Sequence, residues 1–298
     1  MSRLTGKVAI VTGGGRGIGA AVARQLAAEG AAVVVNDLGA DLTGEGVDLS
    51  PAQNVVNEIQ ASGGTASVNG ADVSNYEAVE ALIGGAIEEF GGLHILVNAA
   101  GILRDRMIFN MSEDDWDAVV DVHLKGHYNM IKHASVHWRS LRDAEAENRI
   151  INFTSVAGLH GAATQPNYAS AKMGIVGLTM SCANALTRYG VTTNAIAPGA
   201  NTRISESVPE DQRGMDPAAW AAMTPDKVAP VVSYVAGPES SWLNGRVIAA
   251  HANSVALYDI PTQVRVLNSQ EPWTVDTVGT QMELYFKDLA QVPIRMPV

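Results

Sequence analysis

Two side chains four residues apart could carry out acid–base chemistry, because the chain contains the segment Tyr168-Ala-Ser-Ala-Lys172. Residues at positions i and i+4 of a helix share a face, so the phenol and the ammonium would lie side by side. A phenol with an ordinary pKa of about 10 is a poor base near neutrality, and a neighbouring positive charge lowers that pKa. The pair therefore predicts proton transfer by Tyr168. A solvated Tyr/Lys pair on an amphipathic helix is the alternative interpretation.

A serine thirteen residues before the tyrosine adds a second polar group. Ser155 lies just after the apolar run Ile150–Phe153, which is typical of a strand. Ligands bind where the strands of an open α/β sheet end. A hydroxyl there could donate a hydrogen bond to the oxygen on which negative charge develops as a hydride moves. Thr154 is the alternative donor.

The N-terminal region contains a glycine-rich turn between the strand-like run Val8–Val11 and a helix-like segment. Such a turn lets backbone N–H groups approach a pyrophosphate at the positive end of a helix. We expect Gly13 to make the turn, Gly17 to admit the phosphate, and Gly19 to let the helix pack on the strand. Tight turns without a ligand also use glycine, but the preceding strand and the following helix favour a dinucleotide site. The full segment is Thr12-Gly13-Gly14-Gly15-Arg16-Gly17-Ile18-Gly19.

An acidic residue follows the next strand-like run. Asp37 lies 18 residues after Gly19, where a carboxylate can hydrogen-bond the ribose hydroxyls and repel a 2′-phosphate. This position favours NAD over NADP. The positive charge of Arg16 weakens that preference, and Asp37 could instead be a turn residue.

The elements that must position these residues alternate between strand-like and helix-like segments, which predicts one α/β domain with a doubly wound parallel sheet of about seven strands. The predicted strands are Val8–Val11, Ala32–Asn36, Ser67–Ala71, Ile95–Asn98, Ile150–Phe153, Thr192–Ile196 and Arg246–Ala249. The predicted helices are Ile18–Glu29, Ala52–Ala61, Glu77–Phe90, Trp116–His137, Tyr168–Tyr189 and Pro225–Val235.

Three segments interrupt this alternation. Leu38–Ser50 is a glycine- and aspartate-rich insert, Ala200–Thr224 is polar and falls where a substrate lid would lie, and Ile260–Val298 is a tail with weak periodicity. We therefore expect a catalytic domain over 1–259 and a C-terminal extension over 260–298, which packs on the same domain or on a neighbouring subunit.

Composition excludes several classes of partner. A formal net charge of −11 argues against binding to nucleic acid or to an anionic membrane. The single cysteine, Cys182, permits no intrachain disulfide, and no apolar run reaches the length of about 20 residues that spans a bilayer. No metal site is predicted. A cytoplasmic location and a small-molecule substrate are the expectations.

The spacing of Ser155, Tyr168 and Lys172, together with the pattern Thr-Gly-x-x-x-Gly-x-Gly, resembles the short-chain dehydrogenase/reductase family over about residues 5–250. The resemblance implies a Rossmann-type fold, a nicotinamide cofactor and a homodimer or homotetramer. It also implies cofactor contacts from further residues: Asn98-Ala99-Ala100-Gly101, with alanine where the family has a second asparagine; Asp72 and Val73; Ile196; Pro198-Gly199; and Thr202, with Ser205 as the alternative.

One position departs from the family pattern. His123, in Asp121-Val-His-Leu-Lys-Gly126, stands where the family usually has an asparagine that helps to hold a water molecule for proton transfer. An imidazole both donates and accepts hydrogen bonds, so His123 could join this relay. A histidine that is simply packed or solvated is an equally good interpretation.

The insert, the Val-His-Leu-Lys-Gly segment and Val228-Ala-Pro230 are similar to the (3R)-hydroxyacyl-CoA dehydrogenase branch of peroxisomal multifunctional enzymes and its bacterial relatives. The resemblance implies that Tyr168 removes the hydroxyl proton of a secondary alcohol while a hydride passes to NAD. A 3-hydroxyacyl-CoA or a hydroxysteroid would be the substrate. The alternatives are an NADP-linked 3-oxoacyl reductase and a catalytically silent, cofactor-binding regulator.

Overall fold

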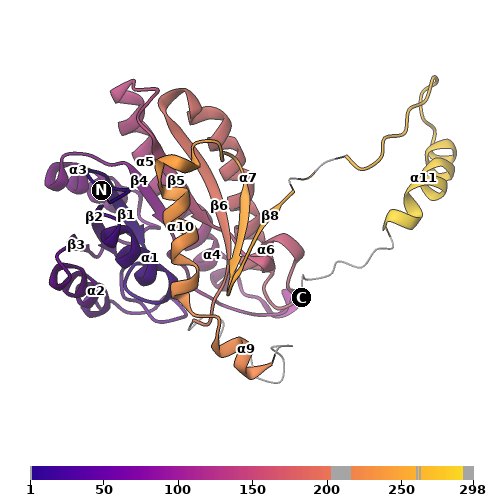
Figure 1. Cartoon of the computed structure of the whole chain (residues 1–298). Coiled ribbons are helices and arrows are strands. Elements are labelled where there is room, and N and C mark those ends of the chain that lie inside the picture. Colours follow the sequence, from indigo (N-terminus) through magenta and orange to yellow (C-terminus); the bar gives the residue numbers. More distant parts are fainter. Residues whose placement is uncertain (1, 203–215, 260, 262, 291–298) are drawn as a thin grey trace. The chain divides into compact units, whose positions relative to one another are not determined.

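The computed structural model describes residues 2–202, 216–259, 261 and 263–290 (Figure 1). The chain divides into two compact units, Met1–Tyr258 and Asp259–Val298. The second unit contains a helix, α11 (Val275–Ala290), that the weak periodicity of the tail did not predict. Within the described residues, no helix is both long and apolar enough to cross a membrane. Most of the predicted lid, including Ser205, lies outside the described residues.

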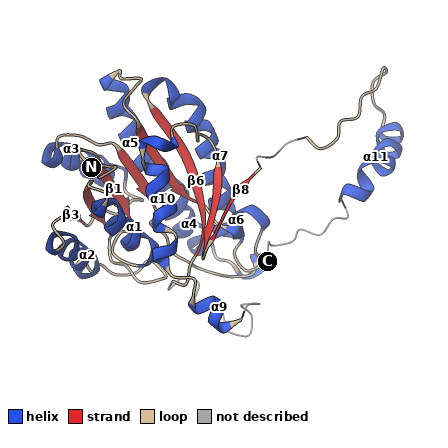
Figure 2. Cartoon of the chain, in the orientation of Figure 1, coloured by secondary structure: helices blue, strands red, loops and turns tan. Residues whose placement is uncertain are grey.

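The first unit is built on an eight-stranded sheet in the order β3-β2-β1-β4-β5-β6-β7-β8 (Figure 2). The first seven strands are parallel, as predicted, and β8 pairs antiparallel with β7. The eighth strand and a two-residue shift of β3 are differences from the prediction. The strands are β1 (Val8–Thr12), β2 (Ala32–Asn36), β3 (Thr65–Asn69), β4 (Ile95–Asn98), β5 (Asn148–Phe153), β6 (Val191–Gly199), β7 (Val247–His251) and β8 (Ser254–Tyr258).

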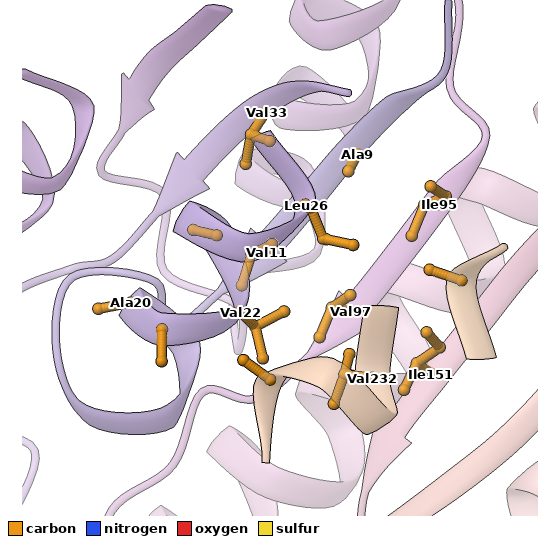
Figure 3. Close-up of a cluster of buried hydrophobic side chains, with 14 of the residues drawn as sticks. Ala9, Val11, Ala20, Val22, Leu26, Val33, Ile95, Val97, Ile151 and Val232 are labelled. Carbon is orange, nitrogen blue, oxygen red and sulfur yellow. The ribbon is translucent and has the colours of Figure 1, made fainter. Parts of the chain in front are cut away.

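The central strands are apolar on both faces because helices cover both faces. On β1, Ala9 and Val11 belong to one buried cluster, whereas Ile10 between them belongs to the cluster on the other face. Figure 3 shows the first cluster, in which Val22 and Leu26 of helix α1 and Val232 of helix α10 pack over the strands. This burial accounts for the near-continuous apolar runs by which the strands were predicted.

Helices α1, α2 and α10 contribute to the first cluster, and α3, α5 and α7 to the second. Short helical segments complete the first unit. The bounds are α1 (Gly17–Ala28), α2 (Ser50–Ala61), α3 (Tyr76–Phe90), η1 (Ile108–Asn110), α4 (Glu113–Val120), α5 (Gly126–Leu141), α6 (Val156–His160), α7 (Pro166–Leu186), η3 (Thr187–Tyr189), α9 (Pro217–Ala221), η5 (Pro225–Lys227), α10 (Ala229–Ala236) and η6 (Pro238–Ser240).

The long helix predicted between β4 and β5 is interrupted by a π-helical turn. Helix α4 begins earlier than predicted, because the Ser112 side chain accepts a hydrogen bond from the Asp115 N–H and caps the first turn. A π-helical turn, η2 (Asp121–Lys125), then joins α4 to α5. His123 lies on this turn. Such turns are rare and often occur at functional sites.

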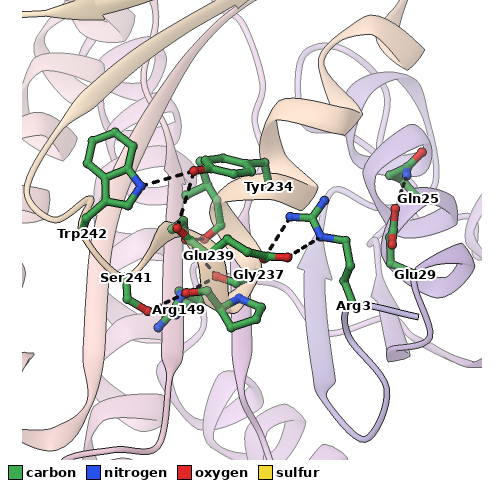
Figure 4. A network of polar contacts seen from close by, with 12 residues as sticks. Arg3, Gln25, Glu29, Arg149, Tyr234, Gly237, Glu239, Ser241 and Trp242 are labelled. Atoms are coloured by element: carbon green, nitrogen blue, oxygen red, sulfur yellow. Dashed lines mark hydrogen bonds and ion pairs between the residues drawn. The ribbon is translucent and has the colours of Figure 1, made fainter. Parts of the chain in front are cut away.

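A buried arginine anchors the N-terminal end of β5. The Arg149 guanidinium donates hydrogen bonds to the Gly237 carbonyl at 3.3 Å and to the Ser241 hydroxyl at 2.8 Å (Figure 4). The neighbouring Glu239 pairs with Arg3 at 3.0 Å. These contacts tie the turn after α10 to the start of β5, so the opposite end of this strand has a fixed position relative to the sheet.

We predict that Gly19→Ala destabilises the protein. A Cβ atom at Gly19 would lie 2.0 Å from the Gly13 carbonyl oxygen, so helix α1 and the glycine turn would have to separate. Overpacking of this kind costs about 1–3 kcal/mol. The free energy of unfolding, measured by urea denaturation, should fall by this amount.

The control is Gly85→Ala on the exposed face of α3, where a Cβ atom would meet nothing within 4 Å. This change should stabilise the protein by about 0.5–1 kcal/mol, because alanine is the better helix former. Equal effects of the two substitutions would contradict the close contact at Gly19.

Candidate active site

The strand register brings the predicted site residues to one edge of the sheet. Thr12 at the end of β1 pairs with Asn36 on one side and Asn98 on the other, and Asn98 pairs with Asn152 of β5. Phe153 pairs with Ile196 of β6. Because parallel strands end at the same edge, the glycine turn and the segment after β5 lie along one line, where open α/β sheets bind ligands.

The glycine turn has the close contacts expected of a dinucleotide-binding turn. Gly13 has a positive φ of 65°, and a Cβ atom there would lie 2.8 Å from the Ala100 Cα atom. Gly17, with φ of 51°, begins helix α1. No side chain caps this helix, and its first turn holds no acidic residue. The N-terminal amides of α1 therefore fit an anionic pyrophosphate. Ile18 is partly buried against the first cluster.

Asp37 holds the turn against the insert. One carboxylate oxygen accepts a hydrogen bond from the Gly15 N–H at 2.8 Å, and the other accepts one from the Gly39 N–H at 2.7 Å. Arg16 donates to the carbonyls of Gly39 and Ala40 at 3.4 and 3.1 Å. It also lies 3.8 Å from the Asp48 carboxylate. The positive charge of Arg16, which weakened the predicted preference for NAD, is thus directed toward the insert.

A set of buried polar side chains connects β1, β4, β5 and α7. The Thr12 hydroxyl accepts hydrogen bonds from the Ala99 and Ala100 N–H groups at 3.1 and 3.2 Å. The Asn98 amide donates to the Asn152 side chain at 2.9 Å, and Asn152 donates to the Thr179 hydroxyl at the same distance. The sequence did not single out Asn152 or Thr179, whose partners lie far away along the chain.

The remaining predicted cofactor residues lie at or near the same edge. Asp72 forms a turn in which its carboxylate accepts hydrogen bonds from the Ser74 N–H and hydroxyl, both at 2.8 Å. Val73 is buried in the second cluster. Pro198 and Gly199 end β6, and Thr202 lies so close to Gly17 that a Cβ atom there would be 3.4 Å from the Thr202 methyl carbon. Their contacts with a cofactor stay predictions.

Tyr168 and Lys172 lie on the first turns of α7, both buried. The Lys172 ammonium donates a hydrogen bond to the Phe153 carbonyl at 2.7 Å and lies 5.5 Å from the centre of the Tyr168 ring. Asn167 fixes the start of the helix by donating to the carbonyls of Arg104 and Asp115 at 3.0 and 2.9 Å. The two catalytic candidates are therefore neighbours on one helical face.

Burial changes the acidities of this pair. It lowers the pKa of Lys172 from 10.5 to about 7. It also raises the pKa of Tyr168 from 10.0 to about 12, although a hydrogen bond with Ser155 acts in the opposite direction. Desolvation penalises the charged form of each group, which explains both directions. The expected lowering of the phenol pKa is therefore outweighed in the protein without a cofactor.

The structure distinguishes Ser155 from Thr154. The Thr154 hydroxyl is buried and donates to the Lys172 carbonyl at 2.7 Å, so it connects β5 to α7. Ser155 is only partly buried, caps α6 by accepting from the Ala157 N–H at 3.2 Å, and is close enough to Tyr168 to lower its pKa. Ser155 is the hydroxyl that faces the phenol.

His123 is buried beside the tyrosine. Its Nε2 atom lies 3.1 Å from the Ile102 nitrogen and 2.9 Å from the Ile102 oxygen, and the tautomer decides which of the two it bonds. Its ring meets the Tyr168 ring edge-on, with the ring centres 5.0 Å apart. A Cβ atom at Gly101 would lie 2.3 Å from the imidazole, so glycine is required there. A relay through His123 stays a prediction.

A second buried histidine was missed. His127, one helical turn after His123, accepts a hydrogen bond from the Phe153 N–H at 3.4 Å. Burial, together with the positive charge of Lys172, lowers the pKa of His127 to about 3, so its ring is neutral at ordinary pH. Its spacing of four residues from His123 was the available signal, because i and i+4 share a helical face.

The insert packs against the segment after β4. The Leu42 carbonyl accepts a hydrogen bond from the Leu103 N–H at 2.9 Å, and the Leu42 side chain packs on the cluster that contains Leu103 and Tyr168. A cavity of about 450 Å³ opens between these segments. It is lined by Leu42, Thr43, Glu45, Leu103, Arg104, Asp105, Arg106 and Asp115. Within the described residues, no group of three potential metal ligands occurs.

Comparisons with known proteins identify relatives over most of the chain. A family model described as short chain dehydrogenase matches residues 7–213. The hydroxyacyl-CoA dehydrogenase ChsB1 of Mycobacterium tuberculosis is 41% identical over 297 residues, which cover 95% of this chain and 89% of that protein. The peroxisomal hydratase-dehydrogenase-epimerase of Neurospora crassa is 40% identical over 257 residues, but these are only 27% of its length.

A solved structure gives the same result. The crystal structure of a short chain dehydrogenase from Mycobacterium avium has a TM-score of 0.83 and 41% sequence identity, and the match covers 99% of this chain and 98% of that chain. This chain thus shares the doubly wound fold of that short chain dehydrogenase.

We predict that the stability of the protein without cofactor depends on pH through Lys172. The pKa of Lys172 is about 7 in the folded protein and 10.5 in an ordinary environment, so between these values the unfolded chain binds a proton that the folded protein does not. The free energy of unfolding therefore rises with pH in this window. Between pH about 7 and pH about 9.5 the contribution is on the order of 1–3 kcal/mol.

Urea denaturation of the wild type and of Lys172→Met across this pH range would measure the contribution of Lys172 to the free energy of unfolding. The difference between their free energies of unfolding should change in favour of the wild type as pH rises. The control, Lys125→Met, removes an exposed lysine that pairs with Asp121 and should leave the pH slope unchanged. Parallel slopes for the wild type and Lys172→Met would contradict the lowered pKa.

Proposed function

The chain belongs to the short-chain dehydrogenase/reductase family, whose members are oxidoreductases acting on CH–OH groups, and we propose that it oxidises a secondary alcohol with NAD. The observation that carries this proposal is the arrangement at the end of β5. There Ser155 is close enough to the Tyr168 phenol to act on its pKa, and Lys172 is buried beside the same ring. Proton removal from an alcohol requires a base and a hydrogen-bond donor on the same oxygen, and this arrangement supplies both.

The roles of the residues follow from their positions. Tyr168 takes the hydroxyl proton of the substrate, and Ser155 donates a hydrogen bond to the same oxygen as it becomes a carbonyl. Lys172 holds the nicotinamide ribose and favours the phenolate by its charge. When bound, the oxidised nicotinamide supplies the hydride acceptor and a positive ring charge. The amides at the start of α1 and the glycine turn hold the pyrophosphate.

The high pKa of Tyr168 makes the proposed reaction dependent on the positive charge of the oxidised nicotinamide. With a pKa of about 12 in the protein without cofactor, the phenol is almost entirely protonated near neutrality. A positive charge nearby lowers the pKa of an acid. The oxidation of an alcohol is therefore expected to speed up with rising pH, and the reverse reaction uses Tyr168 as the acid.

The contacts of Asp37 and Arg16 support NAD as the cofactor. The carboxylate of Asp37 is fixed at the end of β2 by two backbone N–H groups, where it would repel a 2′-phosphate. Arg16 is held by two carbonyls and Asp48 of the insert. An NADP-linked 3-oxoacyl reductase is the second candidate, and it requires Arg16 to leave these partners.

We infer a 3-hydroxyacyl thioester as the substrate and a hydroxysteroid as the second choice. The inference rests on the similarity to the Mycobacterium tuberculosis hydroxyacyl-CoA dehydrogenase and on the extent of the match to it. A homodimer or homotetramer remains the expected assembly, and packing of the C-terminal extension on the same domain or on a neighbour stays a prediction. The silent regulator is the alternative that turnover of any such alcohol would eliminate.

We predict that Tyr168→Phe reduces kcat at least a thousandfold and leaves the dissociation constant for NADH within about threefold, because only the proton-transferring hydroxyl is lost. Ser155→Ala should lower kcat about a hundredfold or more, since a donor to the developing charge is removed. Assays of NADH formation with a 3-hydroxyacyl thioester would measure kcat, and fluorescence titration would measure binding.

Thr154→Val is the matched control for the hydroxyl. Its hydrogen bond to the Lys172 carbonyl is structural, so the change should cost about 1 kcal/mol of stability but reduce kcat far less than Ser155→Ala. Substantial activity in Tyr168→Phe, or a larger loss of kcat in Thr154→Val than in Ser155→Ala, would sink the assignment.

We predict that NADH binds at least tenfold more tightly than NADPH. Asp37→Asn should reduce this preference about tenfold or more, because the negative charge that opposes a 2′-phosphate is removed. Glu58→Gln on α2 removes an equal charge from an exposed pair with Arg24 and serves as the control, with a smaller change. Calorimetric dissociation constants for both cofactors provide the measurement. Tighter binding of NADPH to the wild type would favour the second candidate.

A further inference from the structure

A carboxylate that has no ion pair within the described residues lies close to the proposed catalytic tyrosine. Asp105, on the segment after β4, lines the cavity of about 450 Å³. One of its carboxylate oxygens, Oδ2, accepts a hydrogen bond from the Gln165 side chain at 2.8 Å. The other, Oδ1, is buried and has no hydrogen-bond partner within the described part of the chain. A buried oxygen of this kind is costly unless something compensates it.

Burial raises the pKa of Asp105, whereas the Gln165 hydrogen bond and the positive charge of Arg106 lower it, so the flanking arginines compensate the carboxylate only in part. Arg104 donates to the Thr43 carbonyl and pairs with Glu45 at 3.0 Å, which fastens the insert. Arg106 donates to the backbone carbonyl of Asp105 at 2.7 Å, and its Nε lies 4.0 Å from the Asp115 carboxylate. Among the described residues, no ion pair includes the Asp105 carboxylate. Its negative charge therefore acts on the cavity and on the site next to it.

This charge reaches Tyr168. Gln165, which donates to the carboxylate, occupies the position just before α7, three residues before the tyrosine. Leu103 packs in the same apolar cluster as Tyr168. The charge of Asp105 adds to burial in raising the pKa of Tyr168. Within the described residues, the other groups near the phenol are the neutral Ser155, the neutral buried His123, and Lys172.

We propose that Asp105 is a specificity-determining residue, whose fixed negative charge makes the site select alcohols that are electrically neutral around the reacting carbon. Hydroxy esters, hydroxy thioesters and hydroxy ketones satisfy this condition. Free hydroxy-carboxylates would place a second negative charge beside that of Asp105. Repulsion between two like charges in a partly buried site is strong enough to discriminate about tenfold or more. The inference rests on the proposed oxidation of a secondary alcohol and narrows its substrate class.

Methyl 3-hydroxybutyrate and 3-hydroxybutyrate provide the test, because they differ in charge but share the reacting carbon. The ratio of kcat/KM for the ester to that for the acid would be measured with saturating NAD at pH about 8, where a carboxyl of this kind is ionised. The wild type should favour the ester, and Asp105→Asn should lower the ratio at least tenfold.

Asp117→Asn removes the same charge from the exposed face of α4 and should leave the ratio within about twofold of the wild type. A ratio that does not change in Asp105→Asn overturns the inference. An equal change in Asp117→Asn also overturns it, because the effect would then follow net charge and not the position of Asp105.

A binding measurement separates this inference from the proposed function. Methyl acetoacetate and acetoacetate would be titrated into Tyr168→Phe loaded with NADH, and quenching of the nicotinamide fluorescence would give both dissociation constants. The inference is supported if the ester binds more tightly than the acid and if this preference disappears when Asp105→Asn is added. This holds even if no alcohol is oxidised. Equal binding of both ligands overturns the inference alone, and binding of neither overturns both proposals.

Discussion

The buried ammonium of Lys172 is the constraint on which the rest of the site depends. It is only 4% exposed, forms no ion pair with a carboxylate of the described residues, and donates to the Phe153 carbonyl at 2.7 Å. A buried charge without a counter-ion is costly, so burial lowers the pKa of Lys172. The ammonium also requires a well-placed hydrogen-bond acceptor. The end of β5 supplies that acceptor. Everything that fixes the last residue of β5 therefore also fixes the lysine.

Several contacts serve this one peptide group. His127 accepts the Phe153 N–H beyond the point where β4 ends, and the Thr154 hydroxyl donates to the Lys172 carbonyl. Helix α6 can approach α7 only because residue 158 is glycine, since a Cβ atom there would lie 2.7 Å from the Lys172 Cβ atom. At the other end of the strand, Arg149 holds β5 to the turn after α10. The catalytic candidates thus occupy positions set by both ends of one strand.

The parts of this arrangement that depend on local pattern could be predicted from the sequence. The alternation of apolar runs predicted seven parallel strands, and the spacing of Tyr168 and Lys172 predicted that they share a helical face. Three features could not be predicted, because each depends on a partner that only the tertiary fold brings near. They are the hydrogen bond between His127 and the Phe153 N–H, the Asn152–Thr179 contact, and strand β8. Asp105 belongs to no motif, and it can be identified only from its buried oxygen, which has no hydrogen-bond partner in the part of the chain that the structure describes.

The acidity of Tyr168 illustrates a further limit. The spacing of Tyr168 and Lys172 predicted a lowered phenol pKa from charge alone, but burial acts on both groups at once and weakens the charge of the lysine that was to do the lowering. Asp105 adds a negative charge that acts in the same direction as burial. The protein without cofactor therefore holds its proposed base protonated. In the proposed reaction, a positively charged nicotinamide would favour the phenolate, and the phenolate would in turn favour the charged form of Lys172, which couples proton removal to cofactor binding.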